Sequence, residues 1–276
     1  TFTSEGQTIH GRLWTAGSQA AVVFCHGAFE RQENWAAFAE RLNGEGFATF
    51  TFDFAGHGAS EGLRGSVELR TWAYNIRDAL NYLQSRGWNA FGLVGWESGG
   101  SAALLAAAHD KRLVSAAIIS APVYLVPLLA DRVVYILASA FGRLKMAIVR
   151  RPLILSRRKQ MEQLGLVSDQ AANAAYFADP RVQEIYNAFP MPEGIDNVWV
   201  DITEAVEKVK VPVLVLHGLK DEIVPPSQSE RLMALLSGRK ELKLLDSSAH
   251  ALHLDCDKDE VYSLISAWLK QTLDSR

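Results

Sequence analysis

The segment Leu93-Val94-Gly95-Trp96-Glu97-Ser98-Gly99-Gly100 constrains the fold of this chain more than any other. An apolar run over residues 90–94 leads into Gly95, and an alanine-rich stretch follows at residues 99–108. This order predicts a buried strand, a sharp turn and a helix. The spacing is that of the G-x-S-x-G nucleophile elbow, except that Glu97 stands where the serine is expected.

A shifted register would make Ser98 the elbow residue instead. It would place Trp96 where the turn requires a small residue, and it would move Gly99 and Gly100 out of phase. The steric demand for small flanking residues therefore favours Glu97, and the chemistry of the chain depends on what a carboxylate does at this position.

Short apolar runs alternate with helical patterns along most of the chain. The predicted strands lie at residues 20–25, 47–54, 90–94, 113–120, 211–216 and 242–245. The predicted helices lie at residues 34–42, 66–83, 99–108, 227–236 and 261–269. Such alternation predicts an α/β fold, with a mostly parallel sheet flanked by helices on both faces.

The alternation breaks between residues 122 and 196, where prolines interrupt helical patterns and no strand signal appears. We therefore expect a helical cap insertion over residues 122–196, between two parts of one core, residues 1–121 and residues 197–276. The length of 276 residues suits one large domain with such an insertion.

Charge and cysteine content narrow the partners and the compartment. The net charge of −3 shows no nucleic-acid footprint. Two distant cysteines, Cys25 in an apolar run and Cys256, make a disulfide framework unexpected. The N-terminal residues 1–5 show no signal-peptide pattern, so we expect a cytoplasmic location. The oligomeric state stays open.

The apolar stretch from Ala121 to Gly142 carries Asp131 and Arg132 at its centre. Because charges in mid-span are costly in lipid, a buried or interfacial amphipathic segment is the better interpretation, with membrane contact by the cap as the less favoured alternative. A basic run follows, and it is either a solvated face or an attractor for an anionic substrate or a membrane surface. Its members are Arg150, Arg151, Arg157, Arg158 and Lys159.

Three reactive side chains follow three of the predicted strands. Glu97 follows residues 90–94, Asp221 comes shortly after residues 211–216, and His250 comes shortly after residues 242–245. Reactive groups of parallel sheets gather at the carboxyl ends of the strands. Asp221 is preferred to Glu222 on its spacing from Gly218, and His250 is preferred to His253, which is expected to start the next segment. The order elbow residue, acid, histidine is that of a catalytic triad.

Together these pieces resemble the α/β-hydrolase superfamily, and within it the monoacylglycerol-lipase-like and serine-aminopeptidase-like group. The matching segments are His26-Gly27-Ala28, residues 53–62, residues 95–100, residues 218–225 and His250. The resemblance implies an α/β-hydrolase fold with Glu97 in the nucleophile position, Asp221 as the acid and His250 as the base. It also implies that the backbone N–H groups of Ala28 and Ser98 form the oxyanion hole, and that His57 stabilises a loop.

We therefore expect a hydrolase that cleaves a small, largely apolar ester or related substrate, with Glu97 as a carboxylate nucleophile. Phe29, Trp96 and Tyr124 are the predicted substrate contacts. Two alternatives stay open: a non-hydrolytic lyase, isomerase or cyclase with Glu97 or His250 as general base, and a catalytically decayed ligand-binding protein. No metal-binding or nucleotide-binding motif is present, so no metal site and no cofactor are expected.

Overall fold

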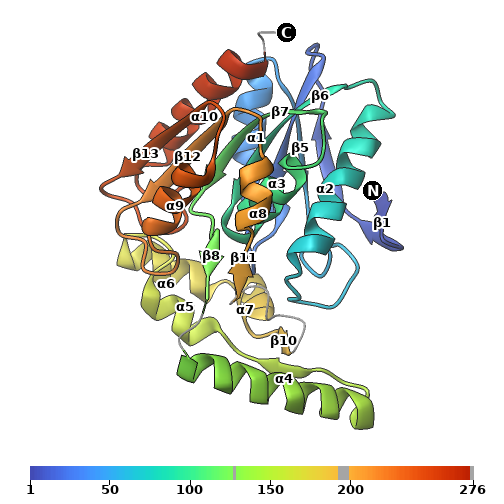
Figure 1. The fold of residues 1–276 in the computed structure, drawn as a ribbon, viewed down its shortest axis with the longest axis vertical. Coiled ribbons are helices and arrows are strands. Elements are labelled where there is room, and N and C mark those ends of the chain that lie inside the picture. Colours follow the sequence, from blue (N-terminus) through green and yellow to red (C-terminus); the bar gives the residue numbers. More distant parts are fainter. Residues whose placement is uncertain (127–128, 192–198, 274–276) are drawn as a thin grey trace.

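A seven-stranded sheet forms the centre of the computed structural model, which describes residues 1–126, 129–191 and 199–273 (Figure 1). The strand order is β13-β12-β7-β6-β4-β5-β3. Six strands run parallel, and β3 pairs antiparallel with β5. The strands are β3 (Gly11–Trp14), β4 (Ala20–Cys25), β5 (Ala48–Phe52), β6 (Ala90–Trp96), β7 (Leu113–Ile119), β12 (Val213–Gly218) and β13 (Lys240–Leu245). The predicted mostly parallel sheet is confirmed.

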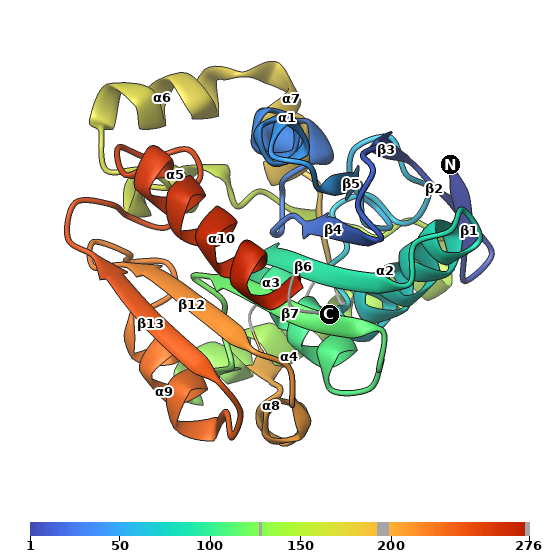
Figure 2. The same ribbon diagram turned by 90° about the horizontal axis from the view of Figure 1, so that it is seen from above.

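Helices cover both faces of this sheet, as Figure 2 shows. One face carries α1 (Ala36–Gly44) and α10 (Lys258–Leu273). The other carries α2 (Leu69–Gln84), α3 (Glu97–Ala107), α8 (Thr203–Lys208) and α9 (Ser227–Leu235). Because helices cover the sheet on both faces, β4, β5 and β7 are buried at every position.

Smaller elements complete the core. A hairpin of β1 (Phe2–Ser4) and β2 (Gln7–Ile9) packs beside α2, and a 3₁₀ helix at Gln32–Trp35 precedes α1. Cys25 lies buried at the end of β4, and neither it nor Cys256 is in a disulfide, as predicted.

The segment that follows β7 lies at one end of the sheet in Figure 1 and is mostly helical. Its elements are β8 (Tyr124–Leu125), α4 (Leu129–Val149), β9 (Leu153–Leu155), α5 (Arg158–Leu164), α6 (Gln170–Ala178), α7 (Pro180–Tyr186) and β10 (Phe189–Met191). The predicted boundary of this segment at residue 196 lies outside the described residues.

The expectation that this segment holds no strand is wrong. β8 pairs antiparallel with β11 (Val200–Asp201), and β9 pairs antiparallel with β10. Strands of two or three residues are too short to display an alternating pattern in the sequence. Pro190 inside β10 hides the signal further, although a proline is tolerated in an edge strand such as this one.

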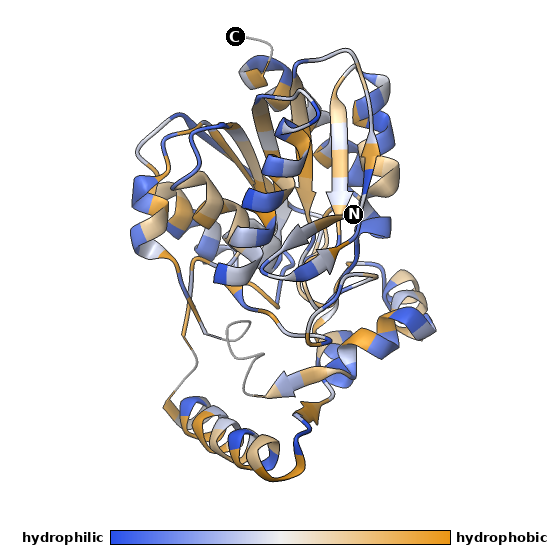
Figure 3. Ribbon diagram, turned by 90° about the vertical axis from the view of Figure 1, so that its right-hand side faces the viewer, coloured by the Kyte–Doolittle hydropathy of each residue, from blue (hydrophilic) through white to orange (hydrophobic). Residues whose placement is uncertain are grey.

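Helix α4 carries several exposed apolar side chains. The ribbon in Figure 3 marks many of its residues as hydrophobic. Leu129 is 76% exposed and Ile148 is 72% exposed. No helix within the described part of the chain is long and apolar enough to cross a bilayer.

Candidate active site

The turn between β6 and α3 is a strained elbow with Glu97 at its apex. Glu97 has a φ of +53°, a left-handed conformation that side chains other than glycine rarely adopt. Gly99 allows α3 to approach β4, since a Cβ at this position would lie 2.1 Å from the backbone oxygen of His26. A Cβ at Gly95 would lie 2.7 Å from the Cα of Gly100. The strained residue is thus Glu97, and the shifted register with Ser98 at the apex is wrong.

Both carboxylate oxygens of the buried Glu97 side chain accept hydrogen bonds. The backbone N–H of Ala28 donates to Oε2 at 2.8 Å, and the hydroxyl of Ser98 donates to Oε1 at 2.8 Å. Ala28 was predicted as an oxyanion donor, and here its N–H already holds an oxygen of the elbow residue. Ser98, the other predicted donor, also lies beside the Glu97 carboxylate. Its contact is made by the side-chain hydroxyl, which was not predicted from the sequence.

Asp221 and His250 meet at the carboxyl ends of β12 and β13. Asp221 Oδ2 lies 2.7 Å from His250 Nδ1, so this nitrogen carries the proton and Nε2 is the one left for proton transfer. Burial alone would lower the pKa of His250, but the charge and hydrogen bond of Asp221 outweigh it and raise this pKa. Burial would raise the pKa of Asp221, and the two histidines beside it outweigh that effect and lower it.

The second of these histidines, His217, was not predicted. It is fully buried at the end of β12, and its Nε2 lies 3.1 Å from Asp221 Oδ2 and 2.8 Å from the backbone oxygen of Val224. The backbone N–H of Val224 in turn donates to Asp221 Oδ1 at 2.8 Å. The sequence could have indicated His217 as a site residue, because it directly follows the strand predicted at residues 211–216.

A second carboxylate–histidine pair, Glu30 and His253, lies near Asp221 and His250. His253 Nε2 lies 2.9 Å from Glu30 Oε1, and the His253 ring stacks on Trp35 at a centroid distance of 4.0 Å. Trp35 Nε1 donates to Glu30 Oε2 at 3.0 Å. Glu30 is almost fully buried. It was not predicted from the sequence, because no motif relates Glu30 to His253 so far along the chain.

Trp96 contacts both His250 and His253. Its Nε1 donates to the backbone oxygen of His250 at 3.0 Å, and its ring lies 4.9 Å from the ring of His253. A Cβ at Gly27 would lie 2.6 Å from the Trp96 ring, so only glycine fits there. Trp96 therefore positions the histidine loop as well as lining the cavity described below.

His57 supports the loop that carries Ala28, as the resemblance implied. The backbone N–H of Phe29 donates to His57 Nε2 at 3.3 Å, while Nδ1 lies 3.3 Å from the backbone oxygen of Ala55. Burial and, secondarily, the charge of His26 lower the pKa of His57 to about 3. A neutral imidazole that accepts on one nitrogen and donates on the other holds this loop in place.

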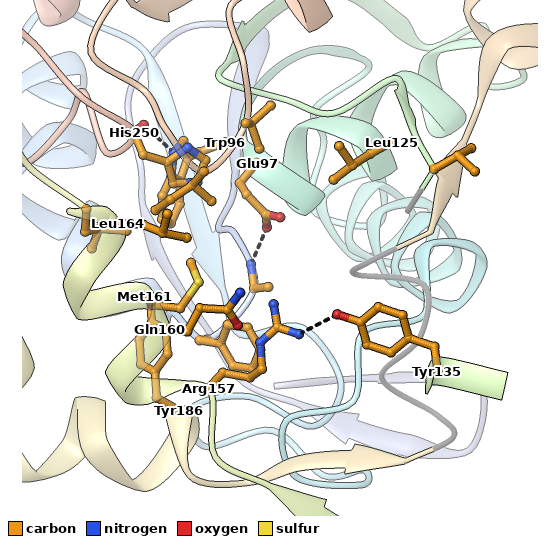
Figure 4. A pocket seen from close by; sticks show the side chains of 16 residues that line it. Trp96, Glu97, Leu125, Tyr135, Arg157, Gln160, Met161, Leu164, Tyr186 and His250 are labelled. Carbon is orange, nitrogen blue, oxygen red and sulfur yellow. Dashed lines mark hydrogen bonds between the residues drawn. The ribbon is translucent and has the colours of Figure 1, made fainter. Parts of the chain in front are cut away.

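A cavity of about 230 Å³ opens beside Glu97 and His250 (Figure 4). The core contributes Ala28, Phe29 and Trp96, and the cap side contributes Leu125, Tyr135, Arg157, Gln160, Met161 and Tyr186, among others. The predicted contacts Phe29 and Trp96 line this cavity.

The third predicted contact, Tyr124, does not line the cavity, and we correct that assignment. Its side chain is 39% exposed and lies under the guanidinium of Arg231. Adjacent residues of a strand point to opposite faces, so Leu125 faces the cavity in its place.

Among the described residues, no group of three or more His, Cys, Asp or Glu side chains is placed to hold a metal ion.

Comparison with known proteins places this geometry in a family. A family model described as serine aminopeptidase, S33, matches residues 16–257. A monoglyceride lipase homolog of Monkeypox virus is 22% identical over 97% of this chain and 96% of its own length. A monoacylglycerol lipase of Mycolicibacterium smegmatis is 23% identical over 93% of this chain and 91% of its own length.

Solved structures agree with the fold. A monoacylglycerol lipase of Paleococcus ferrophilus superposes with a TM-score of 0.77 at 25% identity, and the match covers 95% of this chain and 98% of that one. An alpha/beta hydrolase of Penicillium reaches a TM-score of 0.85 at 19% identity, covering 99% of this chain and 97% of that one. The second likeness shows the fold alone.

Proposed function

Because the chain belongs to the serine aminopeptidase S33 family of hydrolases, we propose that it hydrolyses a small, largely apolar ester or related substrate with Glu97 as nucleophile. One observation carries the proposal: the Glu97 carboxylate sits at the apex of the elbow with Oε2 on the N–H of Ala28. The relatives named as monoacylglycerol lipases support an ester as the substrate class.

The position of Oε2 supports one mode of attack over another. A carbonyl substrate attacked by Glu97 would need the Ala28 N–H for its developing oxyanion, and that donor is already engaged. Displacement at a saturated carbon makes no such demand. Oε1 of Glu97 forms a bond to this carbon, the bond to the leaving oxygen breaks, and the leaving group departs with the electron pair.

The second step uses the rest of the site. His250 Nε2 takes a proton from water, and the hydroxide attacks the carbonyl carbon of the Glu97 ester. The oxyanion that forms lies on the N–H of Ala28, and on that of Ser98 as the elbow geometry implies. Collapse expels the alcohol, which takes the proton from His250 and regenerates the Glu97 carboxylate. Asp221 stabilises the imidazolium through its contact with Nδ1.

Mass spectrometry with isotopic water tests this mechanism. After turnover in H₂¹⁸O with reactive short-chain esters, epoxides or alkyl halides, the peptide that contains Glu97 is expected to carry ¹⁸O. The His250→Ala variant is expected to accumulate an adduct on the same peptide. Glu97→Gln serves as the matched control, because it keeps the shape of the side chain and removes the nucleophile.

Each remaining outcome assigns a different role to Glu97. Turnover without ¹⁸O in Glu97 and without an adduct would reject the nucleophile and leave a general base. Ligand binding with no turnover, unaltered by Glu97→Gln, would reject catalysis altogether.

A further inference from the structure

Arg157 brings a cationic side chain into the wall of the catalytic cavity. It lies between β9 and α5, and its backbone N–H donates to the backbone oxygen of Tyr186 at 2.8 Å, which fixes the start of the side chain. The guanidinium carbon lies 5.3 Å from the ring centre of Phe189, and Nη1 donates to the hydroxyl of Tyr135 at a long 3.5 Å. Its Nε is buried and has no hydrogen-bond partner.

Two other arginines of this segment lie within ion-pair distance of a carboxylate. Arg158 Nε lies 3.8 Å from Glu162, and Arg181 Nη2 lies 2.7 Å from Asp179. No carboxylate lies within ion-pair distance of Arg157 in residues 1–126, 129–191 and 199–273. Arg157 is only partly exposed and its Nε is buried, so an anion supplied by a ligand would offset the cost of keeping this charge in the cavity wall.

The cavity around Arg157 is polar at one end and reactive at the other. Figure 4 shows the guanidinium between Gln160 and Tyr135, turned toward the side of the cavity where Glu97 lies. The apolar side chains of Met161 and Leu164 also line the cavity. An anionic group would be attracted to Arg157 and repelled by the Glu97 carboxylate, so the two charges orient a ligand that is apolar in between.

We infer that Arg157 is a binding residue for the carboxylate end of a small aliphatic substrate, whose opposite end lies at Glu97. The planar guanidinium offers two parallel N–H groups, which match a carboxylate. The cavity of about 230 Å³ accommodates a small ligand. The role of the opposite end rests on the proposed function, whereas carboxylate binding does not.

Equilibrium binding of hexanoate and hexanamide tests the carboxylate site, because the two ligands differ in charge and hardly in size. The wild-type protein is expected to bind hexanoate at least about tenfold more tightly, as for one charge-assisted hydrogen bond or more. Arg157→Met keeps the apolar stem and should abolish the preference, while Arg157→Lys should keep part of it. Arg151→Met, an exposed charge-matched control outside the cavity, should leave the preference unchanged.

The two proposals fail in different ways. Equal binding of the two ligands by the wild-type protein, or an unchanged preference in a folded Arg157→Met variant, would overturn the carboxylate site. Thermal unfolding and the fluorescence of the buried tryptophans report whether the variants are folded. A clear preference for hexanoate without any adduct on Glu97 would leave the carboxylate site standing and reject the nucleophile alone.

Discussion

Replacing Gly99 by alanine tests whether the close approach of α3 to β4 holds Glu97 in its strained position. The added Cβ would lie 2.1 Å from the backbone oxygen of His26 and 2.4 Å from that of Cys25. Cys25 ends the fully buried strand β4 and His26 follows it directly, so neither backbone oxygen can rotate away as a flexible side chain would. The helix and the strand must therefore move apart.

The structure sets the size of the expected effect. Overpacking typically costs about 1–3 kcal/mol, and a clash with two backbone atoms belongs at the upper end, about 3 kcal/mol. At about 2.1 cal/mol/K of unfolding entropy per residue, such a loss lowers the Tm of this 276-residue chain by about 5 °C. The same displacement separates the Ala28 N–H from Glu97 Oε2, now 2.8 Å apart, so kcat should fall as well.

Calorimetric unfolding and turnover of the best reactive ester measure the two effects. Gly44→Ala is the matched control, because a Cβ at Gly44 meets nothing within 4 Å and the residue ends helix α1. Its Tm and kcat should stay close to those of the wild-type protein. A Gly99→Ala variant with the same Tm and kcat as Gly44→Ala would refute the argument that this contact positions the elbow.

Three further predictions concern protonation and substrate contact. Asp221 raises the pKa of His250, so Asp221→Asn should lower the maximum of kcat/KM and shift the acidic side of its pH profile to lower pH. An acidic side at the same pH as in the wild-type protein would contradict the pairing of Asp221 with His250. The pKa of His57 is lowered to about 3 in the folded state, against about 6.5 in the unfolded chain. Between these two values the unfolded state binds one more proton, so the free energy of unfolding falls as the pH drops from about 6.5 toward 3. Urea unfolding across that range should show this slope, and His57→Gln should flatten it. Tyr124→Ala should leave KM unchanged, whereas Leu125→Ala should raise it, and the reverse result in steady-state kinetics would restore Tyr124 as the substrate contact.

Local patterns predicted most of the core. The apolar runs at residues 20–25 and 113–120 match β4 and β7 to within a residue, because a strand buried on both faces has no polar positions to obscure it. The short strands β8 and β9 escaped prediction, since two or three residues carry no measurable period. The order elbow residue, acid, histidine predicted the contact between Asp221 and His250.

By itself, the sequence determined the type of fold, the register of the elbow and the identity of the residue at its apex. These depend on glycine spacing and hydrophobic period, which act over a few neighbouring residues. Only the tertiary structure decided that the Ala28 N–H donates to the Glu97 carboxylate and that Glu30 pairs with His253. It also decided that Arg157 lines the same cavity as Glu97 and His250. Such contacts join segments far apart in the chain, and their geometry follows from how the sheet and the cap pack together.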